Sequence, residues 1–391
     1  MASLADWLTV ARTLPASGTL VGRIWDPSVA GPSVVRVADE ELVDITDTFA
    51  TMRDLCEAKD PATMARRAGG KSRHRLAEIL ANTPVDTRDR SRPWLLATID
   101  LQAIKAAGVT FAISMLERVI EERARGNPQA AAEIRASIRE LIGDDLSKLK
   151  PGSPLAMELK RVLIAKGVWS QYLEVGIGPD AEIFTKSQPM AAVGHGMEAG
   201  LNPISSWNNP EPEVVIVVAS TGAIVGATLG NDVNLRDVEG RSGLLLGKAK
   251  DNNASCAIGP FIRLFDGGFG LDHVRRMELV LRVEGEDGYV LNGSSNMARI
   301  SRDPADLAGQ MMNAHHQYPD GAVLFLGTLY APIDDRDGKG QGFTHKLGDI
   351  VTVSAKELGA LSNRMVATDR AEPWTFGASH LMRNLARRGL L

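Results

Sequence analysis

The sequence predicts an α+β protein, in which a helical segment separates a mixed N-terminal part from a long succession of strands. Residues 127–166 are rich in alanine and carry charges at helical spacing. After Val168, glycine, valine and isoleucine dominate, and short β-branched runs alternate with turn residues to the end of the chain. Residues 1–92 mix both patterns. A chain of 391 residues is long for one core, so we expect two domains.

In the N-terminal part, the segments at residues 19–25 and 33–46 have the apolar, β-branched pattern of short strands, and residues 47–58 have helical periodicity. A basic, polar stretch follows at residues 65–93, and we interpret it as a solvated face and linker. These elements predict a small α/β domain over residues 1–92.

The second predicted domain covers residues 93–391 and contains a helical insertion at about 123–168. Its first helix, Ser114–Arg123, has amphipathic spacing, and the alanine-rich stretch continues the helical pattern. The insertion shows no motif that points to chemistry. We therefore expect the functional residues among the strands that follow it.

The composition excludes several classes of protein. Charged residues make up 24% of the chain and the net charge is −4, which gives no electrostatic reason to expect nucleic acid or an anionic membrane as a partner. The two cysteines, Cys56 and Cys256, cannot build a disulfide framework. There is no apolar run of about 18 residues and no signal-peptide pattern. We expect a soluble protein of the cytoplasm.

A hairpin in the strand-rich part carries carboxylates at its open end. The segments EVVIVVAS and AIVGATLG are strand-like, and a two-residue loop, Thr221–Gly222, is expected to join them. In that register Glu213 faces Gly230, and Glu211 faces Asp232. Because side chains alternate along a strand and directly opposed residues share a face, the register places all three carboxylates on one face.

Three crowded carboxylates repel one another unless a cation neutralises them. Oxygen-only ligation suits Mg²⁺, Mn²⁺ or Ca²⁺ rather than zinc, so Glu211, Glu213 and Asp232 are candidate metal ligands. The alternative is a frayed hairpin end with solvated acids, and Pro212 agrees with that alternative because proline is common where strands start.

The stretch GNDVNLRDVEGRSGLLLGKAKDNNASCAIGP resembles the fumarylacetoacetate hydrolase superfamily. Members of that superfamily have an NDxSxRD motif and a lysine ten residues before a Gly-Pro turn, a spacing that Lys250 and Pro260 match. In the family, a Glu-x-Glu pair and the aspartate of the Asn-Asp motif hold the metal. The resemblance therefore implies the same three ligands, Glu211, Glu213 and Asp232, with Mg²⁺ as cofactor. It also implies a mixed β-roll of mostly antiparallel strands.

Further motifs of the family lie on both sides of this stretch. AEIFTKSQP resembles the strand PEIFFK and contains Glu182 and Lys186, and LFLGTLYAP resembles the loop that contains the family's substrate-contacting threonine, here Thr328. DLQAIKAAGVTFAISMLERVIEE resembles a segment of the branch that acts on 2-keto-3-deoxy sugar acids. The resemblance covers roughly residues 93–122 and 170–360.

The branch of the superfamily decides which reaction the resemblance implies. Members that hydrolyse carbon–carbon bonds in diketo acids usually have a water-activating His-Glu pair, but this chain has no histidine between Gly108 and His195. Ser114 stands about where that histidine would be. The dehydratase branch uses a glutamate and a lysine near the metal, which implies catalytic roles for Glu182 and Lys250. The resemblance does not decide which of the two is the base and which is the acid.

The expected reaction is the dehydration of a 2-keto-3-deoxypentonate to 2,5-dioxopentanoate by C3 deprotonation and loss of the C4 hydroxyl. A C–C bond hydrolase of a 2,4-diketo acid and a non-catalytic metal-binding β protein remain alternatives. The partners expected are a small-molecule substrate and further copies of this chain, as a homodimer or homotetramer. The residues expected to contact the substrate are Thr328, Ser114, Lys186 and Arg236. His195 is interpreted as an ordinary loop residue.

Overall fold

The computed structural model describes the chain except for residues 1–2, 71, 112–114, 116–118, 121, 123–124, 126–148, 166, 168, 331, 333 and 339–341. Most of the predicted helical insertion, and most of the predicted helix Ser114–Arg123, lie outside the described residues. Within the insertion the structure describes one regular helix, α8 (Pro154–Ala165).

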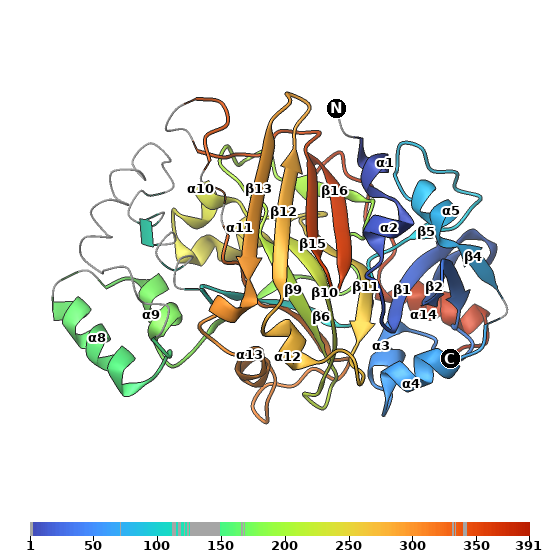
Figure 1. Ribbon diagram of the computed structural model, residues 1–391, viewed down its shortest axis with the longest axis horizontal. Coiled ribbons are helices and arrows are strands. Elements are labelled where there is room, and N and C mark those ends of the chain that lie inside the picture. Colours follow the sequence, from blue (N-terminus) through green and yellow to red (C-terminus); the bar gives the residue numbers. More distant parts are fainter. Residues whose placement is uncertain are drawn as a thin grey trace.

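The described residues form two mixed β-sheets (Figure 1). The strands of the larger sheet are β1 (Leu20–Asp26), β2 (Gly31–Ala38), β3 (Glu41–Asp44), β4 (Arg73–Arg75), β5 (Trp94–Leu95), β6 (Ala103–Gly108), β7 (Glu182–Ser187), β9 (Pro212–Val218), β10 (Ile224–Asp232), β11 (Cys256–Leu264) and β14 (Ala322–Phe325). The strands of the smaller sheet are β8 (Glu198–Leu201), β12 (Glu278–Glu284), β13 (Val290–Asn296), β15 (Ile350–Ala355) and β16 (Gly359–Ala367).

The larger sheet has the order β4-β3-β2-β1-β11-β10-β9-β14-β6-β7, with β5 paired to β1, and the smaller sheet has the order β13-β12-β15-β16-β8. Within these sheets β14–β6 and β16–β8 are parallel, and the other pairs are antiparallel. The predicted α+β class with mostly antiparallel mixed sheets is confirmed.

Short helices cover the sheets and their ends. They are α1 (Leu4–Trp7), α2 (Val10–Thr13), α3 (Met52–Cys56), α4 (Pro61–Arg67), α5 (Leu76–Ala81), α9 (Gln171–Ile177), α10 (Arg236–Glu239), α11 (Leu246–Lys250), α12 (Leu271–Val274), α13 (Pro304–Met311) and α14 (Ala378–Arg387). Figure 1 shows α10 and α11 together on one side of the two sheets and α14 beside β1 and β2.

The core lies on both faces of β9, which is why this strand is apolar at every position except Glu213. Val214 and Ile216 pack in a cluster with β12 and β15 of the smaller sheet. Val215 and Val217 point to the opposite face, where they join a cluster with α3 and α4. Burial on both faces removes the usual alternation of polar and apolar residues from a strand. The hairpin is therefore held rigidly, with its open end fixed by the packing of its middle.

The N-terminal strands continue the larger sheet, because β1 pairs with β11 in the register Leu20↔Arg263 and Val21↔Ile262. The C-terminal helix packs on the same region, where Asn384 Nδ2 donates to Val29 O at 2.8 Å and to Ala30 O at 3.0 Å. The domain boundary at residue 92 stays a prediction.

The interpretation of residues 65–93 as a solvated linker is wrong for part of that stretch. It contains α5, whose Leu76, Ile79 and Leu80 are buried in a core cluster. Arg88 is also covered, since its guanidinium lies 4.7 Å from the centre of the Trp94 ring. Leu76, Ile79 and Leu80 are spaced by three and four residues, which indicates a packed helix face. The many positive charges around them make this pattern hard to recognise in the sequence.

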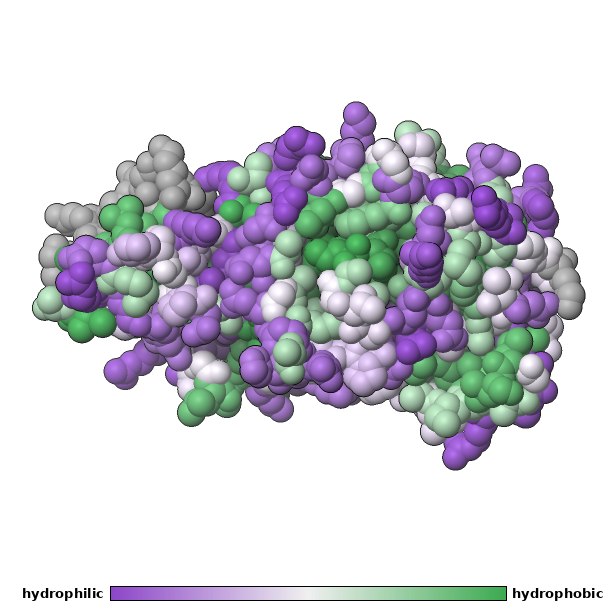
Figure 2. All heavy atoms as spheres, turned by 90° about the horizontal axis from the view of Figure 1, so that it is seen from below, coloured by the Kyte–Doolittle hydropathy of each residue, from purple (hydrophilic) through white to green (hydrophobic). Residues whose placement is uncertain are grey.

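Apolar side chains remain at the surface of α8, where Leu155 is 68% and Ile164 is 52% exposed. Figure 2, the view from below, shows a largely hydrophilic left end with some apolar side chains at the place of α8, and a further apolar hollow near the middle of the face. No helix of the described residues is both long and apolar enough to cross a membrane.

Candidate active site

The register of the β9–β10 hairpin agrees with the prediction at the open end. Glu213 pairs with Gly230, and Asp232 N donates to Glu211 O at 3.1 Å, so Glu211 and Asp232 lie opposite each other. The turn differs from the prediction. Gly222 has a left-handed φ of 86° and donates to Ala219 O, which makes the loop longer than two residues.

A β-bulge explains how a wrong loop length still gives the right register. Val218 pairs with Ile224, one position out of the predicted register, and the shift between Ile224 and Gly226 restores it. A bulge adds one residue to one strand, so it compensates for the extra loop residue on the other side. The three carboxylates therefore keep the predicted common face.

Glu211, Glu213 and Asp232 form a buried acidic triad, with exposed fractions of 3%, 2% and 1%. One ligand oxygen from each lies within 4.8 Å of the others. Burial, together with the carboxylates of Asp232 and Glu211, raises the pKa of Glu213 well above its ordinary value. The alternative of solvated acids is therefore wrong, and the oxygen-only donor set fits a hard divalent cation.

Two lysines contact the triad. Lys250 Nζ lies 2.5 Å from Glu211 Oε2 and 3.0 Å from Asp232 Oδ2, and Lys186 Nζ lies 2.8 Å from Asp232 Oδ1. Buried charges are tolerated when they are paired in this way. Because two ammonium groups face three carboxylates, the cluster keeps a formal excess of negative charge when all are ionised, and this excess favours the binding of a cation.

A backbone N–H fixes the carboxylate of Glu213, and a side chain fixes the backbone of Glu211. Gly327 N donates to Glu213 Oε2 at 2.6 Å, and Glu211 N donates to Asn231 Oδ1 at 3.1 Å. Gly327 follows β14 and has a φ of 87°, and a Cβ there would lie 2.1 Å from Thr110 Oγ1. This position therefore requires glycine for both its conformation and its space.

A small cavity of about 30 Å³ brings the triad together with other predicted residues, since Glu182, Lys250 and Thr328 all line it. Phe184 and Glu239 line it too. The sequence reasoning assigned no role to Glu239, which is 4% exposed and ends the short helix α10. Its place three residues after the arginine of the NDVNLRD motif, on one turn of helix, is the signal that could have pointed to it.

The remaining predicted substrate contacts are placed elsewhere. Lys186 is fully buried beneath the site, where it also donates to the backbone oxygens of Val233, at 3.2 Å, and Lys250. The Arg236 guanidinium stacks over the Trp207 ring at 4.6 Å and donates to Pro332 O at 2.7 Å. Neither residue lines the cavity, so their substrate contacts stay predictions. Ser114 lies outside the described residues.

His195 is not an ordinary loop residue, which corrects the interpretation from the sequence. Its ring is buried, its Nδ1 accepts from Ser362 N at 2.9 Å, and its Nε2 lies 3.1 Å from Thr13 Oγ1. With Nδ1 as the acceptor, the neutral ring carries its proton on Nε2 and links α2 to β16. Burial lowers the pKa of His195 to about 3.

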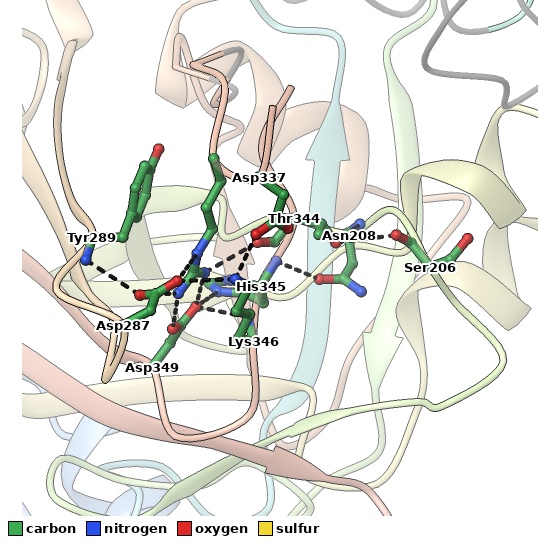
Figure 3. A network of polar contacts seen from close by, with 10 residues as sticks. Ser206, Asn208, Asp287, Tyr289, Asp337, Thr344, His345, Lys346 and Asp349 are labelled. Carbon is green, nitrogen blue, oxygen red and sulfur yellow. Dashed lines mark hydrogen bonds and ion pairs between the residues drawn. The ribbon is translucent and has the colours of Figure 1, made fainter. Parts of the chain in front are cut away.

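The loop that begins at Gly327 and Thr328 is fastened at its far end by an ion-pair network. Arg336 donates two bonds of 2.7 Å to Asp349 and two longer bonds to Asp287 in the β12–β13 turn. Figure 3 shows Asp287, His345 and Asp349 gathered at this point. A bidentate, buried arginine–carboxylate pair is among the stronger polar contacts in proteins, so the loop is held at both ends.

Comparison with protein families places this site in a known domain type. Residues 204–366 match the family described as fumarylacetoacetate (FAA) hydrolase C-terminal. That range contains the whole acidic triad, Lys250 and Thr328, while Glu182 precedes it.

Two curated relatives are similar to part of the chain. The 2-dehydro-3-deoxy-D-arabinonate dehydratase of Saccharolobus solfataricus is 31% identical over 180 residues, which are 46% of this chain and 57% of the relative. The probable 2-keto-3-deoxyxylonate dehydratase of Haloferax volcanii is 30% identical over 192 residues, which are 49% of this chain and 62% of the relative. The matched part thus spans about three fifths of the length of each relative.

Solved structures share the fold at low identity. A 2-keto-3-deoxy-D-arabinonate dehydratase in its apo form has a TM-score of 0.61 and 19% identity, covering 89% of this chain and 99% of that chain. The structure complexed with magnesium and 2,5-dioxopentanoate also has a TM-score of 0.61, with 20% identity, covering 90% of this chain and 100% of that chain. Residues 204–366 therefore resemble the fumarylacetoacetate hydrolase C-terminal family, and the chain is similar in fold to these two solved structures.

Proposed function

We propose that this protein is a metal-dependent dehydratase of a 2-keto-3-deoxy sugar acid. The observation that carries the proposal is the buried acidic triad with Lys250 Nζ on two of its carboxylates and Glu182 in the same cavity. The names of the two curated relatives support a pentonate as substrate, 2-keto-3-deoxy-D-arabinonate or -xylonate. The product would be 2,5-dioxopentanoate.

Glu211, Glu213 and Asp232 would hold the cation, and Mg²⁺ is the proposed metal because the donor set contains oxygen only. When bound, the cation would supply Lewis-acid stabilisation of the charge that develops on the keto oxygen of the substrate. The protein contributes the burial of the triad and the Gly327 N–H bond that fixes Glu213. This bond holds the Glu213 carboxylate in place before the metal binds.

Dehydration needs a base for a C3 proton and an acid for the leaving C4 hydroxyl. Lys250 and Glu182 are the proposed pair, because both line the cavity that the triad opens into. One would take the C3 proton and the other would give a proton to the hydroxyl, which leaves as water. Tautomerisation of the resulting unsaturated keto acid then places an aldehyde at C5.

The two alternatives make different demands on the site. A C–C hydrolase needs a group that activates water, and no histidine is among the described residues that line the cavity. A protein that only binds a metal has no need of a lysine and a further glutamate in the same small cavity. Both considerations favour the dehydratase.

The test is an assay of metal-stripped protein on racemic 2-keto-3-deoxypentonate, with and without added Mg²⁺, followed by mass analysis. We expect a product that has lost one water and carries an aldehyde, formed only with the metal. Cleavage of a 2,4-diketo acid into two smaller acids, without dehydration of the pentonate, would support the hydrolase instead. Metal binding without turnover of either substrate would support the non-catalytic alternative.

A further inference from the structure

The carboxylate of Glu182 occupies the space that a side chain on Gly108 would fill. Gly108 is the last residue of β6 and pairs with Glu182, the first residue of β7. A Cβ on Gly108 would lie 2.0 Å from Glu182 Oε2 and 2.8 Å from its Cδ. Both residues line the cavity of the acidic triad. The Glu182 side chain therefore reaches the cavity by passing over Gly108, the position of β6 that has no side chain.

Gly108 is not needed for its conformational freedom. It is an ordinary strand residue that is not among the glycines with a positive φ, so its backbone conformation is open to alanine. The next residue, Val109, has a φ of 55° and also lines the cavity. A β-branched residue keeps a left-handed conformation only when its surroundings enforce it, and such residues cluster at functional sites. The end of β6 is thus specialised, and at Gly108 the requirement is for space.

The backbone that precedes Glu182 leaves little room for adjustment. Ala181 N donates to Gln310 Oε1 at 2.7 Å. The buried Arg302 donates to Gly178 O at 2.8 Å and to Asp180 O at 3.2 Å. Since the start of β7 is fixed by these bonds and by its pairing with β6, a new contact at Gly108 can be relieved only by rotation of the Glu182 side chain.

We propose that Gly108 is a positioning residue, whose missing side chain sets the place of the Glu182 carboxylate in the cavity. The inference rests on the proposed function, because it gives Glu182 a part in proton transfer. Gly108 itself touches no reacting atom in this account. It acts by leaving one position open to Glu182.

The test substitution is Gly108→Ala. The glutamate oxygen would have to retreat from 2.0 Å to the ordinary contact distance of about 3.4 Å, a displacement of about 1.4 Å. Misplacement of a reacting group by about 1 Å can cost on the order of 100-fold in rate. We expect kcat to fall about 100-fold, with KM and Mg²⁺ affinity nearly unchanged, because the triad lies on β9, β10 and the residue before β9. Titration calorimetry with Mg²⁺ measures the affinity independently of turnover.

A matched control is Gly309→Ala, which adds a Cβ in α13 with no atom within 4 Å and should keep the wild-type kcat. A shorter acid provides a rescue. Glu182→Asp should lower kcat in the wild-type background and raise it in the Gly108→Ala background, because the shorter side chain withdraws the carboxylate from the new methyl group. A merely structural role of Gly108 predicts no such change of sign.

The outcomes separate the inference from the proposed function. If the wild type turns over the substrate and Gly108→Ala has the same kcat, the inference is overturned but the proposed function stands. The same holds if Glu182→Asp lowers kcat in both backgrounds. A wild-type protein without dehydratase activity would refute the proposed function and the inference with it. If Gly108→Ala is too unstable to assay, the melting temperature of the Gly108→Ala/Glu182→Ala double variant is measured instead. A melting temperature restored toward the wild type supports the inference that Glu182 occupies the space of a side chain at position 108, and an unrestored one overturns it.

Discussion

Lys250→Ala should destabilise the metal-free protein strongly. The Lys250 ammonium forms ion pairs with both Glu211 and Asp232, and its Nζ lies 2.5 Å and 3.0 Å from their carboxylate oxygens. All three residues are at least 96% buried. Breaking a buried ion pair by removing one partner typically costs about 3–5 kcal/mol, since the other charge is left uncompensated. Lys186 still contacts Asp232, so Glu211 loses the most.

Mg²⁺ should offset part of that loss. The ammonium and a cation compete for the same carboxylate oxygens, so the variant should bind Mg²⁺ at least as tightly as the wild type. Each tenfold gain in affinity adds about 1.4 kcal/mol of stabilisation when the metal is in excess. The difference in the free energy of unfolding between the two proteins should therefore narrow on addition of Mg²⁺, although turnover is lost.

Urea unfolding of both proteins, with EDTA and with excess Mg²⁺, measures these differences. Lys248→Ala is the matched control, because Lys248 lies on the same helix, α11, and is exposed. The reasoning would be refuted by a Lys250→Ala variant that is as stable as Lys248→Ala in EDTA. It would equally be refuted by a loss of Mg²⁺ affinity in Lys250→Ala.

Three further predictions concern single residues. Glu213→Gln should abolish both Mg²⁺ binding by calorimetry and turnover, and retention of either contradicts its assignment as a ligand. Gly327→Ala should destabilise the protein by about 1–3 kcal/mol in urea unfolding, because a left-handed φ of 87° and the contact with Thr110 both oppose a Cβ, and a neutral effect would contradict this. His195 has a pKa of about 3 when folded and an ordinary pKa near 6.5 when unfolded, so the unfolded chain binds more protons between these values and stability falls as pH decreases. From pH 7 to pH 5 this histidine alone should cost about 2 kcal/mol, and a His195→Asn variant with the same pH slope would show that another group is responsible.

The acidic triad could be predicted from the sequence because it depends on local information. Strand alternation and a short turn place Glu211, Glu213 and Asp232 on one face, and the bulge near Gly226 happens to cancel the error in loop length. Glu182 comes from another part of the chain, and only the resemblance to a family connected it with the triad. Periodicity alone carries no information on which strands become neighbours.

The parts that the sequence reasoning missed depend on contacts between distant segments. The contacts of Lys186 with Asp232 and with the backbone could not be predicted, because they depend on the packing of β7 beneath the site. His195 lies in a glycine-rich turn that resembles a surface loop, and its burial becomes visible only once Thr13 and Ser362 are placed around it. The joining of β1 to β11 has no local signal at all.

That continuous sheet has a consequence for the order of folding. Since β1 pairs with β11 and α14 packs against the region of β2, the first strands of the chain cannot complete their contacts until residues near the C-terminus are available. Pairing of such distant segments closes a large loop and is slow compared with hairpin formation. During synthesis on the ribosome, β9 can pair with β10, and β1 with β2, as soon as both strands have emerged, whereas the pairing of β1 with β11 must wait for β11. In refolding followed by hydrogen exchange, the amides that bond β9 to β10 should be protected before those that bond β1 to β11.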